Sequence, residues 1–159
     1  MATRSKVYDW TQFTEKIEIR ATPARVFNAW TSEKVIVKWF SWKGSLEPKK
    51  GGRFFMQFVT GASGDEKVLA IRKNELFRFS FGKDGETVEV RFKKVKEGCD
   101  CILRQYGMKD TPKARVEWHM GCRNGWVFFL TNLKAFLEHR LDLRSQNPKK
   151  SYLQGYVNS

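Results

Sequence analysis

The sequence contains few of the residues that form disulfide frameworks, metal sites or membrane spans. It has three cysteines and two histidines in 159 residues, and three cysteines cannot all pair within one chain. The longest apolar run has five residues, WVFFL at 126–130, which is far shorter than a membrane span. The opening residues, MATRSKVYDW, lack the apolar core of a secretion signal. The sequence therefore predicts a reducing, cytoplasmic compartment and no membrane span.

Acidic residues are also scarce, since 17 Asp and Glu face 30 Lys and Arg, for a net charge of +13. Such an excess supports binding to nucleic acid or to an anionic membrane when the cations cluster. Here the basic pairs at 49–50, 93–94 and 149–150 lie in separate segments, and the charges of 86–95 alternate with apolar residues. We therefore predict a general solubility charge rather than a nucleic-acid-binding face.

Catalytic motifs are missing as well. No Ser, His and acid spacing, phosphate-binding glycine loop or paired-carboxylate motif stands out in the sequence. An enzyme built on His119 with Gln105 or Tyr106 in a cavity is an alternative, but a lone histidine near a pocket is more often structural. The sequence therefore predicts no catalytic residue and no cofactor, and it favours a binding protein over an enzyme.

One candidate metal set combines Cys99-x-Cys101 with His119-x-x-Cys122. Strand and helix spacings would place these four side chains at a similar depth in a sheet-and-helix fold. Structural zinc sites, however, usually carry paired cysteines separated by two to four residues on a turn. Free, buried cysteines are the simpler interpretation, and we predict no metal.

Periodicity predicts the order of the elements. An alternating strand at 13–20 precedes two short helices, which begin at Thr22-Pro23 and at Ser32. Further strands follow without an intervening helix, at 53–60, 66–73, 76–82, 86–95 and 99–107, with a short strand around 42–47. We expect three parts, namely an N-terminal extension at 1–12, one domain at 13–144 and a tail at 145–159.

The last helix carries an unusually broad apolar face. Thr111 and Pro112 form its N-cap and first turn, and the apolar pattern continues to about Leu141. At 100° per residue its apolar side chains span an arc of roughly 140°, with Thr131 and Asn132 on the opposite, solvent-facing side. So broad a face requires a curved partner, which predicts an α+β fold whose antiparallel sheet wraps around this helix.

Four segments resemble a known family. They are ATPARVFNAWT at 21–31, KWF at 38–40, EPKKGGRF at 47–54 and GWVFFLTNLKAFLEHRLDLR at 125–144, and they resemble the family of homologues of the activator of heat-shock-protein-90 ATPase. This family lies within the START-like helix-grip superfamily, also called SRPBCC. The resemblance implies a helix-grip fold with a hydrophobic cavity. Its members include lipid and hormone binders, co-chaperones and a minority of cyclases and hydrolases, so the fold does not choose the activity.

The candidate site is the cavity between the sheet and the last helix. Core packing explains any one of its residues as well as a ligand does, and a buried Gln105 amide needs a polar partner in either case. We predict non-catalytic binding of a small hydrophobic, aromatic or lipid-like ligand. A module that regulates a chaperone ATPase, a self-associating protein and a cavity enzyme are the alternatives. The predicted lining is Trp30, Trp39, Phe54, Met56, Phe58, Phe79, Phe81, Val90, Phe92, Leu103, Gln105, Trp126, Phe129, Leu130 and Leu133.

Overall fold

The computed structural model describes residues 7–145, 147 and 149, so most of the tail at 145–159 lies outside the described residues. Within them, one antiparallel sheet has the strand order β1-β7-β6-β5-β4-β3-β2. Its strands are β1 (Gln12–Ile19), β2 (Lys43–Leu46), β3 (Arg53–Gln57), β4 (Ser63–Arg72), β5 (Leu76–Ser80), β6 (Thr87–Val95) and β7 (Gly98–Tyr106). The helices are α1 (Pro23–Thr31), α2 (Glu33–Ile36), α3 (Pro112–Ala114), η1 (Arg115–Met120) and α4 (Gly121–His139).

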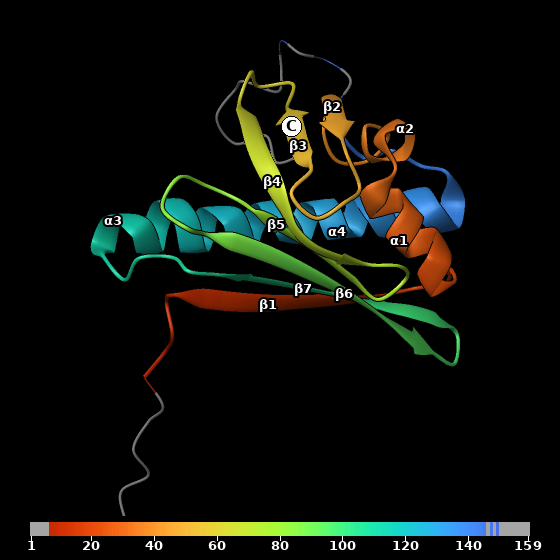
Figure 1. The fold of residues 1–159 in the computed structure, drawn as a ribbon, viewed down its shortest axis with the longest axis horizontal. Coiled ribbons are helices and arrows are strands. Elements are labelled where there is room, and N and C mark those ends of the chain that lie inside the picture. The colour runs from red at the N-terminus through yellow and green to blue at the C-terminus, as the bar shows by residue number, and fades with distance from the viewer. Residues whose placement is uncertain (1–6, 146, 148, 150–159) are drawn as a thin grey trace, which may run out of the picture.

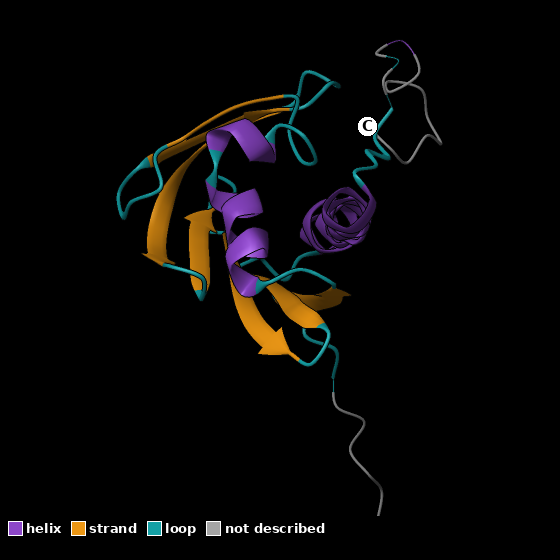
Figure 2. Cartoon of the chain, turned by 90° about the vertical axis from the view of Figure 1, so that its right-hand side faces the viewer, coloured by secondary structure: helices purple, strands orange, loops and turns teal. Residues whose placement is uncertain are grey.

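The sheet curves around α4, and α1 and α2 close the opening between the two. Figure 1 shows α4 crossing the sheet lengthwise, and Figure 2 looks along α4 with the strands curving around one side of it. The α+β helix-grip fold predicted from the sequence is thereby confirmed, as is the predicted order of strands and helices. Among the described helices, none combines the length and apolar composition needed to cross a membrane.

The three predicted capping residues precede their helices, and two of them make the side-chain capping bond. The Thr22 hydroxyl accepts from the Arg25 amide at 3.2 Å, and the Thr111 hydroxyl accepts from the Ala114 amide at 3.2 Å. Each thus satisfies one N–H that the first helical turn leaves without a partner. Ser32 is the N-cap of α2, as predicted, but its side chain makes no capping hydrogen bond.

The final helix is not one continuous α-helix. Between α3 and α4, the six residues of η1 wind as a π-helix. A π-turn holds more residues than an α-turn, so side chains before it rotate relative to those after it. A constant 100° per residue therefore does not describe η1, which contains Trp118 and His119.

The inner face of the sheet is apolar because the strand register aligns its large side chains. Across β5 and β6, Phe79 pairs with Val88 and Phe77 pairs with Val90, and Val90 in turn pairs with Leu103 on β7. All five side chains are fully buried. Cross-strand pairs of this kind stabilise a sheet, and here they also form the concave surface that α4 faces.

Asn132 ties the end of α4 to the segment after it. Its side chain is 0% exposed, with Nδ2 donating to the Trp39 carbonyl at 2.7 Å and Oδ1 accepting from the Leu143 amide at 2.7 Å. The prediction that Asn132 faces solvent is therefore wrong. The chain folds back after α4 and covers a position that would otherwise be exposed.

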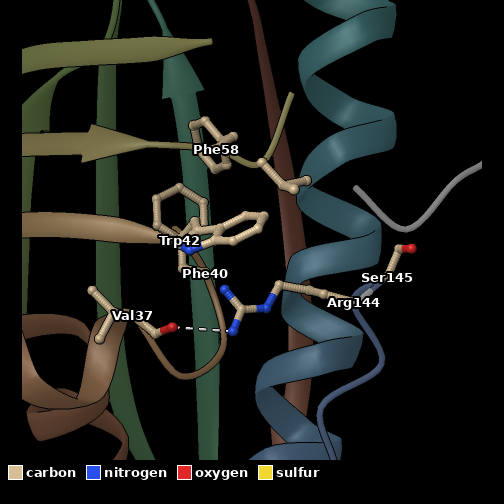
Figure 3. A pocket seen from close by; sticks show the side chains of 7 residues that line it. Val37, Phe40, Trp42, Phe58, Arg144 and Ser145 are labelled. Atoms are coloured by element: carbon tan, nitrogen blue, oxygen red, sulfur yellow. Dashed lines mark hydrogen bonds between the residues drawn. The ribbon is translucent and has the colours of Figure 1, made fainter. Parts of the chain in front are cut away.

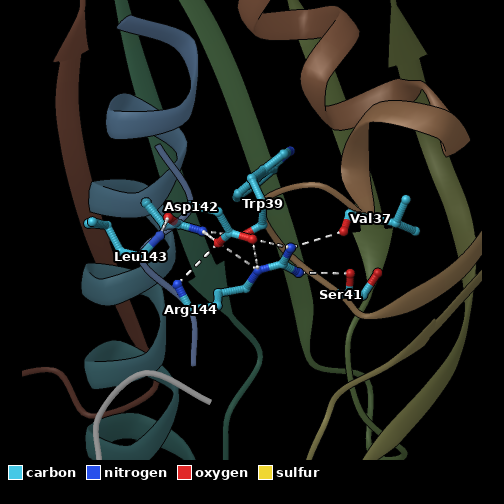
Figure 4. Close-up of polar contacts among 7 residues, drawn as sticks. Val37, Trp39, Ser41, Asp142, Leu143 and Arg144 are labelled. Atoms are coloured by element: carbon cyan, nitrogen blue, oxygen red, sulfur yellow. Dashed lines mark hydrogen bonds and ion pairs between the residues drawn. The ribbon is translucent and has the colours of Figure 1, made fainter. Parts of the chain in front are cut away.

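Arg144 completes this connection, which Figure 4 shows in close-up. Its guanidinium donates to the Ser41 carbonyl at 2.9 Å and to the Val37 carbonyl at 3.0 Å, and it pairs with Asp142. Burial alone would raise the pKa of Asp142, but hydrogen bonds from Arg144 hold that pKa below its ordinary value. We call residues 142–144 the C-terminal strap, since they fasten α4 to the turn that follows α2.

Candidate functional site: a hollow at the mouth of the helix grip

The centre of the helix grip is filled by aromatic rings rather than left open. Trp126 of α4 is 2% exposed and stacks on Phe40 with ring centroids 5.2 Å apart and planes 10° apart. It also contacts Trp30 at 5.9 Å and Phe81 at 5.4 Å. Such pairs stabilise a core beyond the apolar area they bury. A ligand therefore has no room at the level of Trp126.

Gln105 is the polar group of this interior, and its partner is the Trp126 indole. The Trp126 Nε1–H donates to the Gln105 Oε1 at 2.8 Å, and the Gln105 Nε2 lies 3.8 Å from the Met108 sulfur. The polar partner that the sequence required for a buried Gln105 amide is thus a side chain of α4. Because its carbonyl is satisfied within the core, Gln105 orients Trp126.

A hollow of about 600 Å³ opens beside this filled core. It lies where the β3–β4 hairpin, the β5–β6 loop and η1 meet, and we call it the mouth hollow. Rings and a thioether form its apolar wall, while hairpin and loop residues form its rim. Its lining residues are Met56, Phe58, Ala62, Ser63, Gly64, Asp65, Glu66, Phe81, Gly82, Lys83, Asp84 and Trp118.

Gly82 lets Trp118 approach the β5–β6 loop closely. Its φ is +125°, and a Cβ at this position would lie 2.9 Å from the Trp118 ring and 2.6 Å from a Glu86 carboxylate oxygen. Only glycine accommodates both this backbone and this contact. The Gly82 amide donates to Glu66 at 3.2 Å, which joins β4 to the loop. Trp118 therefore forms one wall of the mouth hollow.

The carboxylates at the rim are already engaged by protein groups. Asp65 forms an ion pair with Arg53 at 2.7 Å, and Asp84 forms one with Lys109 at 2.8 Å. Hydrogen bonds from Arg53 lower the pKa of Asp65. A general acid near neutral pH requires a raised carboxyl pKa, and Asp65 shows the opposite. The rim is thus suited to shielding an apolar ligand from solvent rather than to proton transfer.

A second hollow, of about 270 Å³, lies along the C-terminal strap. Figure 3 shows the Arg144 side chain extending toward the Val37 carbonyl below Phe40, Trp42 and Phe58. Phe58 lines this hollow and the mouth hollow alike, and its ring contacts Phe40 at 5.2 Å. Phe58 therefore separates the two spaces.

The structure places the predicted site residues in two groups. Met56, Phe58 and Phe81 line the mouth hollow, and Phe129 contacts Phe58 at 5.7 Å. The remaining predicted residues belong to the packed interior around the hollow: Trp30, Trp39, Phe54, Phe79, Val90, Phe92, Leu103, Gln105, Trp126, Leu130 and Leu133. The lining predicted from the sequence omitted Trp118 and the rim loops. Trp118 could have been included, because it extends the apolar face of the last helix.

His119 serves to dock the N-terminal segment. It is 1% exposed, and its two ring nitrogens lie 3.0 Å from the Trp10 carbonyl and 2.7 Å from the Tyr8 hydroxyl. A carbonyl only accepts, so Nδ1–H donates to Trp10 and Nε2 accepts from Tyr8. Phe13 packs edge-on against the same ring. Both nitrogens are thus occupied by protein partners.

The cysteines remain free thiols and do not form a metal site with His119. No group of three or more His, Cys, Asp or Glu residues within the described part of the chain could hold a metal ion. Burial raises the pKa of Cys99 to about 11, and it also raises the pKa values of Cys101 and Cys122. Neutral thiols are poor nucleophiles.

A family profile decides the assignment. The profile described as "Activator of Hsp90 ATPase homolog 1-like protein" matches residues 20–138, well over half of the chain. The chain belongs to this family. Its matched region runs from the end of β1 almost to the end of α4 and includes most of the mouth hollow's walls.

Solved structures agree with the family at the level of the fold. The protein SSP2350 from Staphylococcus saprophyticus is 21% identical with a TM-score of 0.73, and the match covers 84% of this chain and 96% of that one. MLL2253 from Mesorhizobium loti is 22% identical with a TM-score of 0.69, covering 83% and 99%. A structure described as the Aha1 dimer from Colwellia psychrerythraea is 20% identical with a TM-score of 0.72, covering 80% and 96%. A search of curated proteins finds no match.

Proposed function

We propose that this family member binds a small hydrophobic, aromatic or lipid-like ligand in the mouth hollow, without covalent chemistry. One observation carries the proposal: a hollow of about 600 Å³ with walls of Met56, Phe58, Phe81 and Trp118 adjoins a core that side chains already fill. Small-molecule sites commonly have volumes of about 300–1,000 Å³ and mostly apolar walls. The helix-grip fold suits such binding.

The walls supply the main driving force of this binding. Each 100 Å² of apolar wall that a ligand covers contributes about 2.5 kcal/mol, before the loss of ligand freedom is subtracted. Phe81 contacts the Trp126 ring, so a ligand against Phe81 also changes the environment of a core indole. The paired rim carboxylates offer few polar contacts, which supports a ligand recognised mainly by shape and apolar area.

Native mass spectrometry of the purified chain, followed by organic extraction, tests the proposal. We expect a retained apolar molecule, or binding of Nile red or of members of a panel of fatty acids, sterols and flavonoids. Tryptophan fluorescence of the chain should shift on binding. No retained mass together with an unmoved fluorescence signal across the panel would exclude the proposal.

Replacing Trp118 with alanine should weaken Nile red binding about tenfold, because an indole wall contributes one to a few kcal/mol of apolar contact. Trp42→Ala is the matched control, since Trp42 is 49% exposed and lines only the hollow along the strap. Titration of the dye followed by its emission measures both affinities. Equal weakening by the two substitutions would place the dye elsewhere.

The rival function is a protein-interaction module that regulates a chaperone ATPase. The family description names this activity, and the solved Aha1 dimer adds self-association as a further partner type. Such a module would bind an acidic partner through its basic surface, and salt would weaken the complex. Association that persists with the mouth hollow filled favours this rival. The three free cysteines of the protein suit a reducing, cytoplasmic compartment under either function.

A further inference from the structure

A third hollow, of about 330 Å³, lies at the opposite end of α4 from the mouth hollow. Its residue Phe136 follows Trp118 by 18 positions along the helix, which corresponds to about 27 Å. Three cations from three separate segments border it, and we call it the basic hollow. Its lining residues are Ala24, Arg25, Asn28, Val35, Lys38, Phe136, Leu137 and Arg140.

Within the described residues, the three cations of the basic hollow have no acidic partner. In the described part of the chain, none of the ion pairs involves Arg25, Lys38 or Arg140. Many other cations of this protein do pair with a carboxylate, as Arg53 and Lys109 do at the mouth. Like charges gathered around one concave surface raise the local positive potential.

The acidic residues nearest in sequence are committed to other groups. Glu33 accepts from the Leu46 amide at 3.1 Å, and Glu138 accepts from the Arg20 amide and from Lys134, each at 2.8 Å. Among the residues that the structure describes, no carboxylate lines the basic hollow. The positive potential of the hollow is therefore not neutralised from within the described residues.

The position of the cations is set by the fold. The Arg25 Nη2 donates to the Leu137 carbonyl at 3.3 Å, which holds this guanidinium beside the end of α4. Arg140 is the C-cap of α4, with a left-handed backbone at φ 60° and an exposed side chain. Asn28 adds an exposed amide from α1. A guanidinium held in place loses less freedom when it binds an anion.

The floor of the basic hollow is apolar. Val35 and Phe136 are partly buried members of the hydrophobic core edge, and Leu137 is buried. An inorganic anion would leave this floor uncovered, whereas an anion attached to a short hydrocarbon would cover it. Apolar floor and cationic rim together fit an amphiphile.

We propose that the basic hollow binds an anionic group, a phosphate or a carboxylate, carried on an apolar chain. Charge-assisted hydrogen bonds from Arg25, Lys38 and Arg140 hold the anion, and Val35 and Phe136 contact the first part of the chain. The site is separate from the mouth hollow and does not depend on the ligand proposed there. The anion is either the head of a dissolved amphiphile or the headgroup of a lipid in a membrane.

Titrating the full chain with octyl phosphate, followed by amide chemical shifts in NMR, tests this site. We expect shifts at Asn28 and Arg140, an affinity that falls with added salt, and a much smaller response to octanol. Inorganic phosphate should produce weaker shifts at the same positions, because it leaves the floor uncovered. Equal responses to octanol and octyl phosphate would overturn the proposal, as would an absence of shifts at these residues.

Charge-removing variants separate the site from the overall positive charge. Lys38→Gln and Arg140→Asn should each weaken octyl phosphate binding about tenfold, since each removes one charge-assisted contact. Lys43→Gln and Lys73→Gln remove the same charge at exposed positions outside the hollow and should change the affinity less than about twofold. Equal losses in all four variants would overturn the proposal.

Vesicles distinguish the two sources of the anion. If the anion is a membrane headgroup, the chain should sediment with phosphatidylcholine vesicles that contain phosphatidic acid. It should not sediment with vesicles that lack phosphatidic acid, and Lys38→Gln should abolish the sedimentation. Binding of octyl phosphate without vesicle binding identifies a dissolved amphiphile. If Lys38→Gln and Arg140→Asn change neither vesicle binding nor octyl phosphate binding, the anion does not bind in the basic hollow.

Discussion

Replacing Trp126 with alanine should lower the free energy of unfolding by about 4–5 kcal/mol. The substitution removes a ring that stacks on Phe40 and contacts Trp30 and Phe81, and the packed surroundings can fill the space only in part. It also removes the 2.8 Å hydrogen bond that the Trp126 indole donates to the buried Gln105 carbonyl, which adds to the loss. Urea unfolding followed by circular dichroism measures the change.

Two comparisons show whether packing is the cause. Trp42→Ala removes the same side chain at a 49% exposed position and should change stability by only about 0.5 kcal/mol. Combining Trp126→Phe with Gln105→Leu should recover part of the stability that Trp126→Phe alone loses, because both polar partners are then removed together. A Trp126→Ala variant within about 1 kcal/mol of the native chain would mean that the interior is not filled as described.

Asn132→Leu should cost about 3 kcal/mol, although leucine is similar in size and more apolar. The substitution removes the donor to the Trp39 carbonyl and the acceptor for the Leu143 amide, so both backbone groups lose these hydrogen bonds. The C-terminal strap should then open locally. Hydrogen exchange at the Leu143 amide, measured beside urea unfolding, reports the two effects separately.

Thr131→Leu is the matched control for this substitution. Thr131 precedes Asn132 on the same helix and is exposed, so its replacement should alter stability by only about 0.5 kcal/mol and leave the Leu143 amide protected. If Asn132→Leu behaved like Thr131→Leu in both measurements, the strap would not be fastened through Asn132.

Local patterns account for most of the fold. Alternation located every strand to within a few residues, because one face of each strand packs against a core and the other meets solvent. The caps at Thr22 and Thr111 were predictable because their side chains bond within one turn. The broad apolar arc of α4 was enough to predict the curved sheet around it, since no flat partner covers such an arc.

The features that the sequence did not predict depend on contacts between segments that are far apart in the chain. Asn132 looks solvent-facing on a helical wheel, but the strap 10 or more residues later and the Trp39 carbonyl, 93 residues earlier, bury it. His119 lies in the π-helix, and its partners Tyr8 and Trp10 are more than 100 residues away in the sequence. The rim of the mouth hollow comes from two hairpin loops whose own residues carry no apolar pattern.

An apolar ligand in the mouth hollow would compete with a side chain placed there, and Gly64→Leu places one. Gly64 pairs with Met56 across β3 and β4, so a side chain there points to the same face. A Cβ at Gly64 meets only ordinary contacts, at 3.4 Å and beyond. The leucine should therefore fill the hollow without strain and add up to about 1 kcal/mol of stability by removing a strand glycine.

The decisive measurement is Nile red affinity of the native chain, of Gly64→Leu and of Lys67→Leu, which adds a leucine on the opposite, exposed face of β4. We predict that Gly64→Leu weakens binding by about tenfold or more and that Lys67→Leu leaves it within about twofold. Unchanged Nile red binding in a stably folded Gly64→Leu variant would contradict binding in the mouth hollow.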